Sequence, residues 1–243
     1  MLTLNNFYTW FHNYYQSFYS TDPEIMTMVQ FKEAHSIRVA SCARDLAQNI
    51  SLAPEKIALA ELCGLLHDIA RSEQAQLKTF RDSLSFDHGD RGATRIIESK
   101  ILSNLDNTLQ EIIVFAVKYH NKLAVPDTSP AKMEFANITR DADKLDILRT
   151  LPPIEAAHNY SPVLLELLRT NQSLSFSAIK TRADIRLIRL GWLYDINYSW
   201  TLDQLVKEGY IENLLSSLPD ESPFDEIKTN LLSYINTMLK KTS

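Results

Sequence analysis

The sequence predicts an all-α protein, and three observations carry this prediction. The 243 residues include only five glycines, 45% of them are apolar, and the apolar residues recur at helical spacing with little β-branched alternation. A chain of this length can bury a large core. We therefore expect a single all-helical domain over residues 1–243.

Charge and cysteine content restrict the partners. The formal net charge is −5 and the pI is about 5.7, so we expect no basic surface for a nucleic-acid polymer. Cys42 and Cys63 lie in apolar helical patterns without metal-knuckle spacing, which predicts reduced core residues of a cytoplasmic protein. The sequence contains no secretory leader and no apolar run of membrane-spanning length, so we expect a soluble protein with no membrane partner.

The first two predicted helices come from an aromatic stripe and from a capping signal. Aromatic residues at helical spacing over residues 4–20 predict a helix packed on the core. Asp22 and Pro23 predict an N-cap and a first turn, with the helix running to about residue 50. Its apolar stripe would place His35 at a core position, and Arg38 on a neighbouring face is a candidate partner for a carboxylate or a phosphate. The predicted stripe comprises Phe31, His35, Val39, Cys42, Leu46 and Ile50.

The next helix is predicted to carry a His-Asp pair inside an apolar run. Ser51 or Ala53 would cap it, Pro54 would occupy its first turn, and residues 57–70 would form a buried helix containing His67 and Asp68. An unpaired buried carboxylate costs several kcal/mol, so Asp68 needs a cation, a set of donors or a metal ion beside it. Gly64 costs about 1 kcal/mol relative to alanine within a helix. It therefore predicts the close approach of another helix.

The polar segment that follows predicts a loop over an active site. Residues 71–92 hold two of the few glycines, Gly89 and Gly92. Asp87 is predicted to cap a helix through residues 93–101, which would place His88 in its first turn.

Two further helices are predicted to bring ligands. One, over residues 109–120, ends at Asn121 and Lys122, so that His120 continues its apolar stripe. The other, over residues 135–149, is rich in carboxylates, and Asp143 rather than Asp141 or Asp146 is expected to point inward.

The C-terminal third shows helical patterns near residues 161–170, 177–197, 200–217 and 223–240, without a cluster of histidines or acids. We expect these helices, within residues 151–243, to complete the core and the pocket. Residues 163–169 suit either the core or a homodimer interface. His158 is expected to have no chemical role.

Six residues from these segments form the candidate metal site: His35, His67, Asp68, His88, His120 and Asp143. Imidazole nitrogens mixed with carboxylate oxygens suit iron, manganese, zinc, nickel or cobalt. Spacing alone leaves open the alternative of unrelated core histidines beside a surface acidic helix.

The order of these residues resembles the HD-domain metal-dependent phosphohydrolases. Their signature is a histidine, a His-Asp doublet and a downstream aspartate, with two intervening histidines in members that hold two metals. The resemblance covers about residues 30–150 and implies an HD-domain helical bundle with additional C-terminal helices. It implies one or two ions, the first held by His35, His67, Asp68 and Asp143. His88 and His120 would hold a second ion or contact substrate phosphate.

The resemblance also implies an activity, namely hydrolysis of a phosphate ester or anhydride, of a nucleotide or dinucleotide, by a metal-bound hydroxide. Asp68 would bridge two ions, Lys144 would bind phosphate and assist catalysis, and Arg38 and Arg71 would contact the substrate. Glu73 is a candidate general base, with a solvated loop residue as the alternative. Two other functions stay open, a di-iron oxygenase of HD type and a non-catalytic nucleotide-binding regulatory module. Intact ligands argue against the regulatory module.

Overall fold

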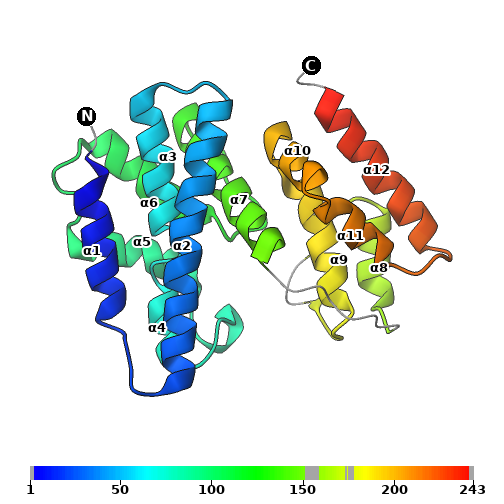
Figure 1. Ribbon diagram of the computed structural model, residues 1–243, viewed down its shortest axis with the longest axis horizontal. Helices are drawn as coiled ribbons and strands as arrows, with labels where there is room; N and C mark the ends of the chain where they lie inside the picture. The colour runs from blue at the N-terminus through cyan, green and yellow to red at the C-terminus, as the bar shows by residue number, and fades with distance from the viewer. Residues whose placement is uncertain (1–2, 151–158, 173, 175–177, 241–243) are drawn as a thin grey trace. The chain divides into compact units, whose positions relative to one another are not determined.

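The computed structural model describes residues 3–150, 159–172, 174 and 178–240, and these residues form helices and no strand. The all-α prediction is confirmed. The helices group into two compact units, residues 1–146 and residues 147–243 (Figure 1). The single domain over the whole chain stays a prediction. No helix in the described ranges is both long and apolar enough to cross a membrane.

The first unit contains every predicted metal ligand. Within it α2 packs against α3, α5 against α6, and α3 also against α6. Its helices are α1 (Leu4–Gln16), α2 (Pro23–Asn49), α3 (Pro54–Leu66), α4 (Arg71–Gln76), the 3-10 helix η1 (Asp82–Leu84), α5 (His88–Ser99), α6 (Asn107–Tyr119) and α7 (Pro130–Thr150), whose last residues belong to the second unit.

The predicted capping residues begin these helices. The Asp22 side chain accepts from the backbone N–H groups of residues 24 and 25, and α2 runs from Pro23 to Asn49 without a break. The Asp87 side chain likewise accepts from the N–H of Asp90 at the start of α5. The predicted stripe of α2 was wrong at Phe31, which is 46% exposed, whereas Lys32 beside it is buried. Apolar periodicity misplaced Phe31, because the adjacent Lys32 is the residue that turns inward, toward the Asp68 carboxylate.

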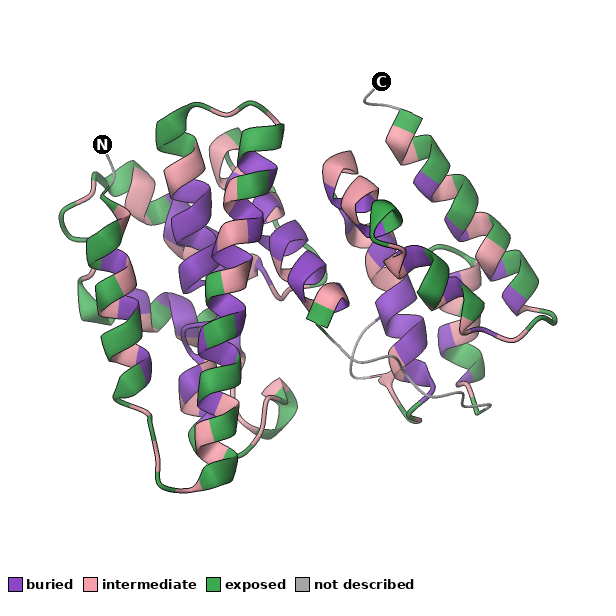
Figure 2. Ribbon diagram, in the orientation of Figure 1, coloured by how far each residue is buried: buried purple, intermediate pink, exposed green. Residues whose placement is uncertain are grey.

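Helix α3 is the most deeply buried segment of the unit. Every residue from 59 to 70 is buried, and Figure 2 shows the C-terminal part of α3 in purple. A Cβ added to Gly64 would lie 2.9 Å from the carbonyl oxygen of Val39 and 3.0 Å from the Cα of Ala40. The predicted close approach at Gly64 is therefore confirmed, and the partner is α2, which carries His35.

The His-Asp pair lies at the end of α3. The prediction of one helix through residue 70 was wrong, because α3 ends at Leu66, His67 is its C-cap and α4 begins at Arg71. Asp68 therefore stands in the turn between two helices. The predicted loop after it is partly wrong as well, since α4 and η1 occupy much of residues 71–84.

A second close approach joins α5 to α6. A Cβ added to Gly89 would lie 2.7 Å from the carbonyl oxygen of Lys118, so only glycine permits this contact. It brings the start of α5 beside the end of α6. His88 and His120 stand at these two ends.

The second unit is built from the predicted C-terminal helical patterns. In it α8 contributes the buried Leu164 and Leu168 to the core while Val163 is exposed, and the predicted homodimer stays a prediction. Gly209, at φ +74°, divides the predicted helix near residues 200–217 in two. His158 lies outside the described residues. The helices are α8 (Pro162–Arg169), α9 (Asp184–Gly191), the 3-10 helix η3 (Trp192–Asp195), α10 (Ser199–Lys207), α11 (Tyr210–Ser216) and α12 (Phe224–Lys240).

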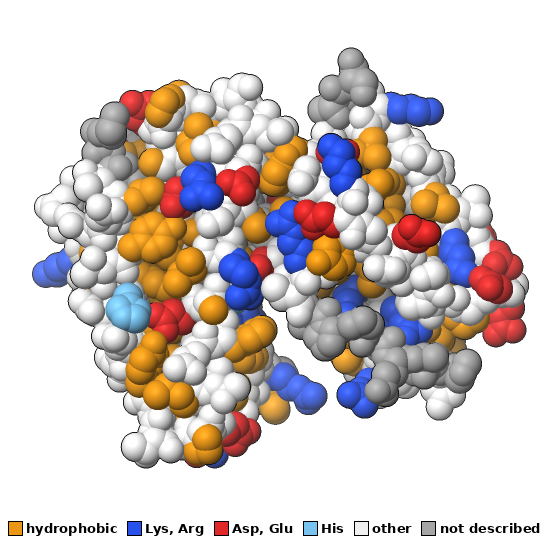
Figure 3. All heavy atoms as spheres, viewed as in Figure 1, with side chains coloured by type: hydrophobic (Ala, Val, Ile, Leu, Met, Phe, Trp, Pro, Cys, Tyr) orange, Lys and Arg blue, Asp and Glu red, His pale blue; other side chains and the backbone are white. Residues whose placement is uncertain are grey.

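On the face viewed in Figure 3, lysine and arginine side chains of both units lie among acidic and apolar ones. Cys42 and Cys63 are both buried, as predicted for core residues.

Candidate metal centre

Four histidines from four segments of the first unit use the same ring nitrogen as a hydrogen-bond donor. Each Nδ1 lies 2.7 Å from an oxygen that has no hydrogen to donate, either a carboxylate or a backbone carbonyl. Each neutral ring therefore carries its hydrogen on Nδ1 and a lone pair on Nε2. The four pairs are His35 with Asp146, His67 with the Gly64 carbonyl, His88 with Asp82, and His120 with the Val117 carbonyl.

Two of these histidines are oriented in the same way, each by the C-terminal end of its helix. His67 is the C-cap of α3 and His120 is the C-cap of α6. Each Nδ1 donates to the carbonyl three residues earlier, which is one of the carbonyls that a helix end leaves without a helical partner. The ends of the two helices thus fix both rings.

The first group of converging donors contains His35, His67 and the two predicted aspartates. The Asp143 Oδ1 lies 3.1 Å from the His35 Nε2 and 3.5 Å from the His67 Nε2. The Asp68 Oδ2 lies 3.5 Å from both nitrogens. The His35 Nε2, the His67 Nε2 and the Asp143 Oδ1 are buried and have no hydrogen-bond partner. Buried polar atoms are rarely left in this state, so this group has the chemistry of an ion site.

The second group uses the other oxygen of Asp68. The Nε2 atoms of His88 and His120 are 3.1 Å apart, and each lies 3.5 Å from the Asp68 Oδ1. Because both rings carry their hydrogens on Nδ1, no hydrogen lies between the two Nε2 atoms. Two lone pairs at this separation repel each other unless a cation lies beside them.

The donor separations match the edges of a coordination shell. Nitrogen and oxygen ligands lie about 2.0–2.2 Å from a zinc-like divalent ion, so neighbouring ligands are about 3.0–3.5 Å apart in octahedral or tetrahedral geometry. Separations of 3.1–3.5 Å occur in both groups. The residues therefore fit a divalent transition metal in each group. Asp68 is common to both.

Two cations accompany Asp68, and the sequence pattern missed one of them. The buried Lys32 donates from Nζ to the Asp68 Oδ2 at 2.7 Å, and the Arg71 Nε lies 3.4 Å from the Asp68 Oδ1. Burial acts to raise the pKa of Asp68, but Lys32, His67 and Arg71 lower it well below its ordinary value. The requirement that Asp68 have a cationic partner is therefore met within the chain.

Burial lowers the pKa values of both histidines in the second group. Burial, followed by the Arg71 charge, lowers the pKa of His88 to about 4, and burial also lowers the pKa of His120. Both rings are therefore neutral near pH 7, as ligands must be. Burial alone would lower the pKa of His67 too, but the carboxylates of Asp68 and Asp143 raise it. Neutral His88 and His120 each have a lone pair on Nε2, and that of His88 lies 3.2 Å from the Arg71 Nη2.

Residues outside the predicted set hold the ligands in place. Asp82 of η1 accepts from His88, Gln74 and Asn121, and buried Arg140 of α7 donates to the carbonyls of residues 119, 120 and 122 at the end of α6. Carboxylates and carbonyls of this kind fix the tautomer and the orientation of metal-ligating histidines. A sequence signal for Asp82 existed in its polar segment, but no spacing rule connects it to His88.

Arg38 acts through Asp146 in this structure. Its guanidinium donates to both Asp146 oxygens, at 2.7 and 3.0 Å, and Asp146 in turn accepts from His35. Arg38 thus pairs with a carboxylate, one of its two predicted partners. Its predicted contact with substrate stays a prediction.

Substituting Asp146 by asparagine should lower metal affinity about 10- to 100-fold, the usual effect of losing such a partner. The amide keeps the size of the side chain but removes the charge that Arg38 and His35 share. Equilibrium dialysis of Mn²⁺ checks this, with the exposed Asp45→Asn as the matched control. Unchanged affinity in Asp146→Asn would show that Asp146 does not position His35.

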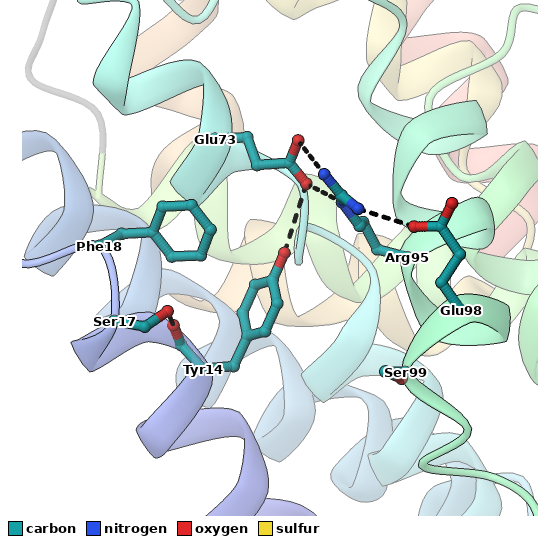
Figure 4. Close-up of a pocket in the computed structure, with 7 residues that line it drawn as sticks. All are labelled: Tyr14, Ser17, Phe18, Glu73, Arg95, Glu98 and Ser99. Atoms are coloured by element: carbon teal, nitrogen blue, oxygen red, sulfur yellow. Dashed lines mark hydrogen bonds and ion pairs between the residues drawn. The ribbon is translucent and has the colours of Figure 1, made fainter.

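Glu73 is not brought to the histidines. Its carboxylate accepts from Tyr14, Arg91 and Arg95, and the arginines hold its pKa below the ordinary value although burial acts to raise it. Figure 4 shows Glu73 and Arg95 beside Tyr14 in a surface cavity of about 390 Å³. The contacts therefore give no support to Glu73 as the general base.

The carboxylate-rich helix α7 differs from expectation in its burial. Asp143 does face the cluster, yet its side chain is 18% exposed, whereas Asp141 and Asp146 are almost completely buried. The expectation that Asp143 is the most inward of the three was therefore wrong. Helical periodicity could not predict the burial of Asp146, because that burial depends on its contacts with His35 and Arg38 on another helix. Lys144, which follows Asp143, is buried, and its role in phosphate binding and catalysis stays a prediction.

Comparison with known proteins gives one match. The family model of the HD domain matches residues 33–148. Neither the curated proteins nor the solved structures yield a match. The matched range contains all six candidate ligands, from His35 to Asp143, and ends close to the boundary of the first unit. Residues 33–148 therefore form an HD domain.

Proposed function

We propose that this chain hydrolyses a phosphate ester or anhydride bond, in a nucleotide or dinucleotide, at a centre of two divalent transition-metal ions. One observation carries the proposal. Six ligands form two groups with coordination-shell spacing, and the two oxygens of Asp68 serve one group each. Paired ions of this kind stabilise both the attacking and the leaving oxygen in a displacement at phosphorus.

The ligand residues have distinct tasks in this proposal. His35, His67, Asp143 and the Asp68 Oδ2 would hold one ion, while His88, His120 and the Asp68 Oδ1 would hold the other. When bound, such ions lower the pKa of a coordinated water toward about 7 and neutralise phosphoryl charge. Asp146 and Asp82 keep the Nε2 atoms of His35 and His88 directed at the ions.

Two cations and an aromatic ring beside the ligands support a phosphate-bearing substrate with a planar base. Lys32 and Arg71 both lie against Asp68. The half-buried ring of Phe80 lies 5.5 Å from the Lys32 Nζ and 5.7 Å from the Arg71 guanidinium carbon. Guanidinium and ammonium groups stabilise developing phosphoryl charge, and an aromatic ring offers a stacking surface for a base. A nucleotide presents both features.

A phosphate-release screen tests this function. Metal-free protein reloaded separately with Mn²⁺, Co²⁺, Ni²⁺, Fe²⁺ or Zn²⁺ is offered nucleoside monophosphates, nucleoside triphosphates and dinucleoside polyphosphates. We expect turnover with at least one metal, and its loss together with metal in His67→Ala. His12→Ala is the matched control, because His12 is half exposed and contacts Glu33 instead of the cluster.

The remaining outcomes distinguish the alternatives. If the metal-loaded protein releases phosphate from none of these substrates, the proposed hydrolase activity is contradicted. Oxygen consumption by the iron-loaded protein would then indicate an oxygenase, and nucleotide binding without turnover would indicate a regulatory module.

A further inference from the structure

Arg71 contacts the same lone pair that a metal ion in the second group requires. Its Nη2 lies 3.2 Å from the His88 Nε2, and its Nε lies 3.4 Å from the Asp68 Oδ1. The His88 Nδ1 is committed to Asp82, so Nε2 is the only ring nitrogen left as an acceptor. A ring nitrogen has a single lone pair. It accepts from Arg71 or binds an ion, and it cannot do both.

In the first group no ring nitrogen has such a competitor. The Nε2 atoms of His35 and His67 are buried without a hydrogen-bond partner, and so is the Asp143 Oδ1. This group also has two carboxylates, whereas the second has only its share of Asp68. Each group has one cation beside its Asp68 oxygen, Lys32 at Oδ2 and Arg71 at Oδ1, but only Arg71 also contacts a ring nitrogen of its group. The two groups are therefore unequal.

The position of Arg71 is held from its other side. Its Nη1 donates to the Gln74 side chain and to the Phe80 carbonyl oxygen, the latter at 2.7 Å, and it lies 3.3 Å from Asp82. Nη2 and Nε are left to face His88 and Asp68. A phosphate oxygen accepts readily from this edge of a guanidinium, commonly through two parallel hydrogen bonds.

Resting on the function proposed above, we propose that Arg71 gates the second metal. In the substrate-free protein Arg71 holds the His88 lone pair, so the first group fills first and the second ion binds weakly. A phosphate group draws Nη2 away from His88 and adds negative charge. The second ion then binds, so substrate and second ion favour each other.

Metal binding by the full-length, metal-free protein tests the gate without relying on turnover. Equilibrium dialysis with Mn²⁺, followed by elemental analysis, gives the stoichiometry and both dissociation constants. Wild type should bind one ion at least about tenfold more tightly than the second, a difference on the scale of a typical coupling between ligands. Arg71→Gln should tighten the second ion by about the same factor and leave the first unchanged.

Inorganic phosphate is the probe for the substrate. It should tighten the second ion in wild type and have a smaller effect in Arg71→Gln, because the competing donor is already absent. His88→Ala should lose the second ion alone. The exposed Arg81→Gln from the same segment is the matched control and should behave as wild type.

Two results would overturn the gate. One is equal affinity for both ions in wild type, and the other is a second ion that weakens in Arg71→Gln. If Arg71→Gln does not fold, Arg71→Lys keeps the charge but loses the planar fork, and it should still release the His88 lone pair. Two-step metal binding without phosphate release would support the role of Arg71 and contradict the proposed hydrolase activity. Phosphate release by a protein that binds two equivalent ions would support the hydrolase activity and contradict the role of Arg71.

Discussion

Asp68→Asn is expected to abolish binding of both ions and to reduce phosphate release by more than about 1,000-fold, which corresponds to about 4 kcal/mol of lost transition-state stabilisation. One oxygen or the other of the Asp68 carboxylate lies 3.5 Å from the Nε2 atom of each of the four histidines. An amide supplies one neutral oxygen, and its N–H₂ group would confront one of the two groups with hydrogen atoms. No other single substitution should empty both groups.

The same substitution should destabilise the metal-free protein. Buried Lys32 loses its 2.7 Å partner, and an uncompensated buried charge costs about 3–5 kcal/mol. Elemental analysis, phosphate release and thermal unfolding of the metal-free form measure the three effects. Asp143→Asn is the matched control, since it alters the first group and leaves the Lys32–Asp68 pair intact. Two bound ions in Asp68→Asn would contradict the shared ligand.

Gly64→Ala is expected to destabilise the first unit by about 1–3 kcal/mol, the usual cost of forcing a methyl group into a packed core. Helix propensity alone predicts the opposite sign, a gain of about 1 kcal/mol. The steric cost should win because the nearest atoms are backbone atoms of α2, at 2.9 and 3.0 Å, and backbone cannot rotate away. Separation of α2 from α3 should also weaken metal binding, because His35 and His67 stand on these two helices.

Denaturant unfolding and Mn²⁺ dialysis measure both consequences. Gly191→Ala in α9 is the matched control, because its added Cβ would meet side-chain atoms of Leu174 instead of backbone atoms. A side chain can adjust more readily than backbone, so the control should lose less stability than Gly64→Ala. A more stable Gly64→Ala protein would contradict the close packing of α2 against α3 at Gly64.

Part of the local structure of this protein followed from its sequence. Few glycines and helical periodicity predicted an all-α fold, and Asp22, Pro54 and Asp87 marked helix starts because capping depends on neighbouring residues only. The HD motif gave the six candidate ligands in order along the chain. Gly64 even indicated a close helix contact, since a buried helical glycine needs a compensating neighbour.

Partnerships between distant residues did not follow from the sequence. Lys32 pairs with Asp68 across 36 residues and His35 with Asp146 across 111, and neither pair has a spacing rule. Glu73 was a candidate general base because it lies close to Asp68 in the sequence. In the structure its carboxylate accepts hydrogen bonds from Arg91 and Arg95 instead. The periodicity of α2 gave no sign that Lys32 is buried, because its partner Asp68 lies on another segment of the chain.

The sequence by itself therefore determined the helical class, several helix starts and which residue types are available for a metal, because caps, periodicity and ligand chemistry are local properties. Only the tertiary structure decided how these ligands divide into two groups around Asp68, and that Arg71 stands against one of them. Such an arrangement depends on distances between side chains of separate helices, which packing sets and sequence order does not.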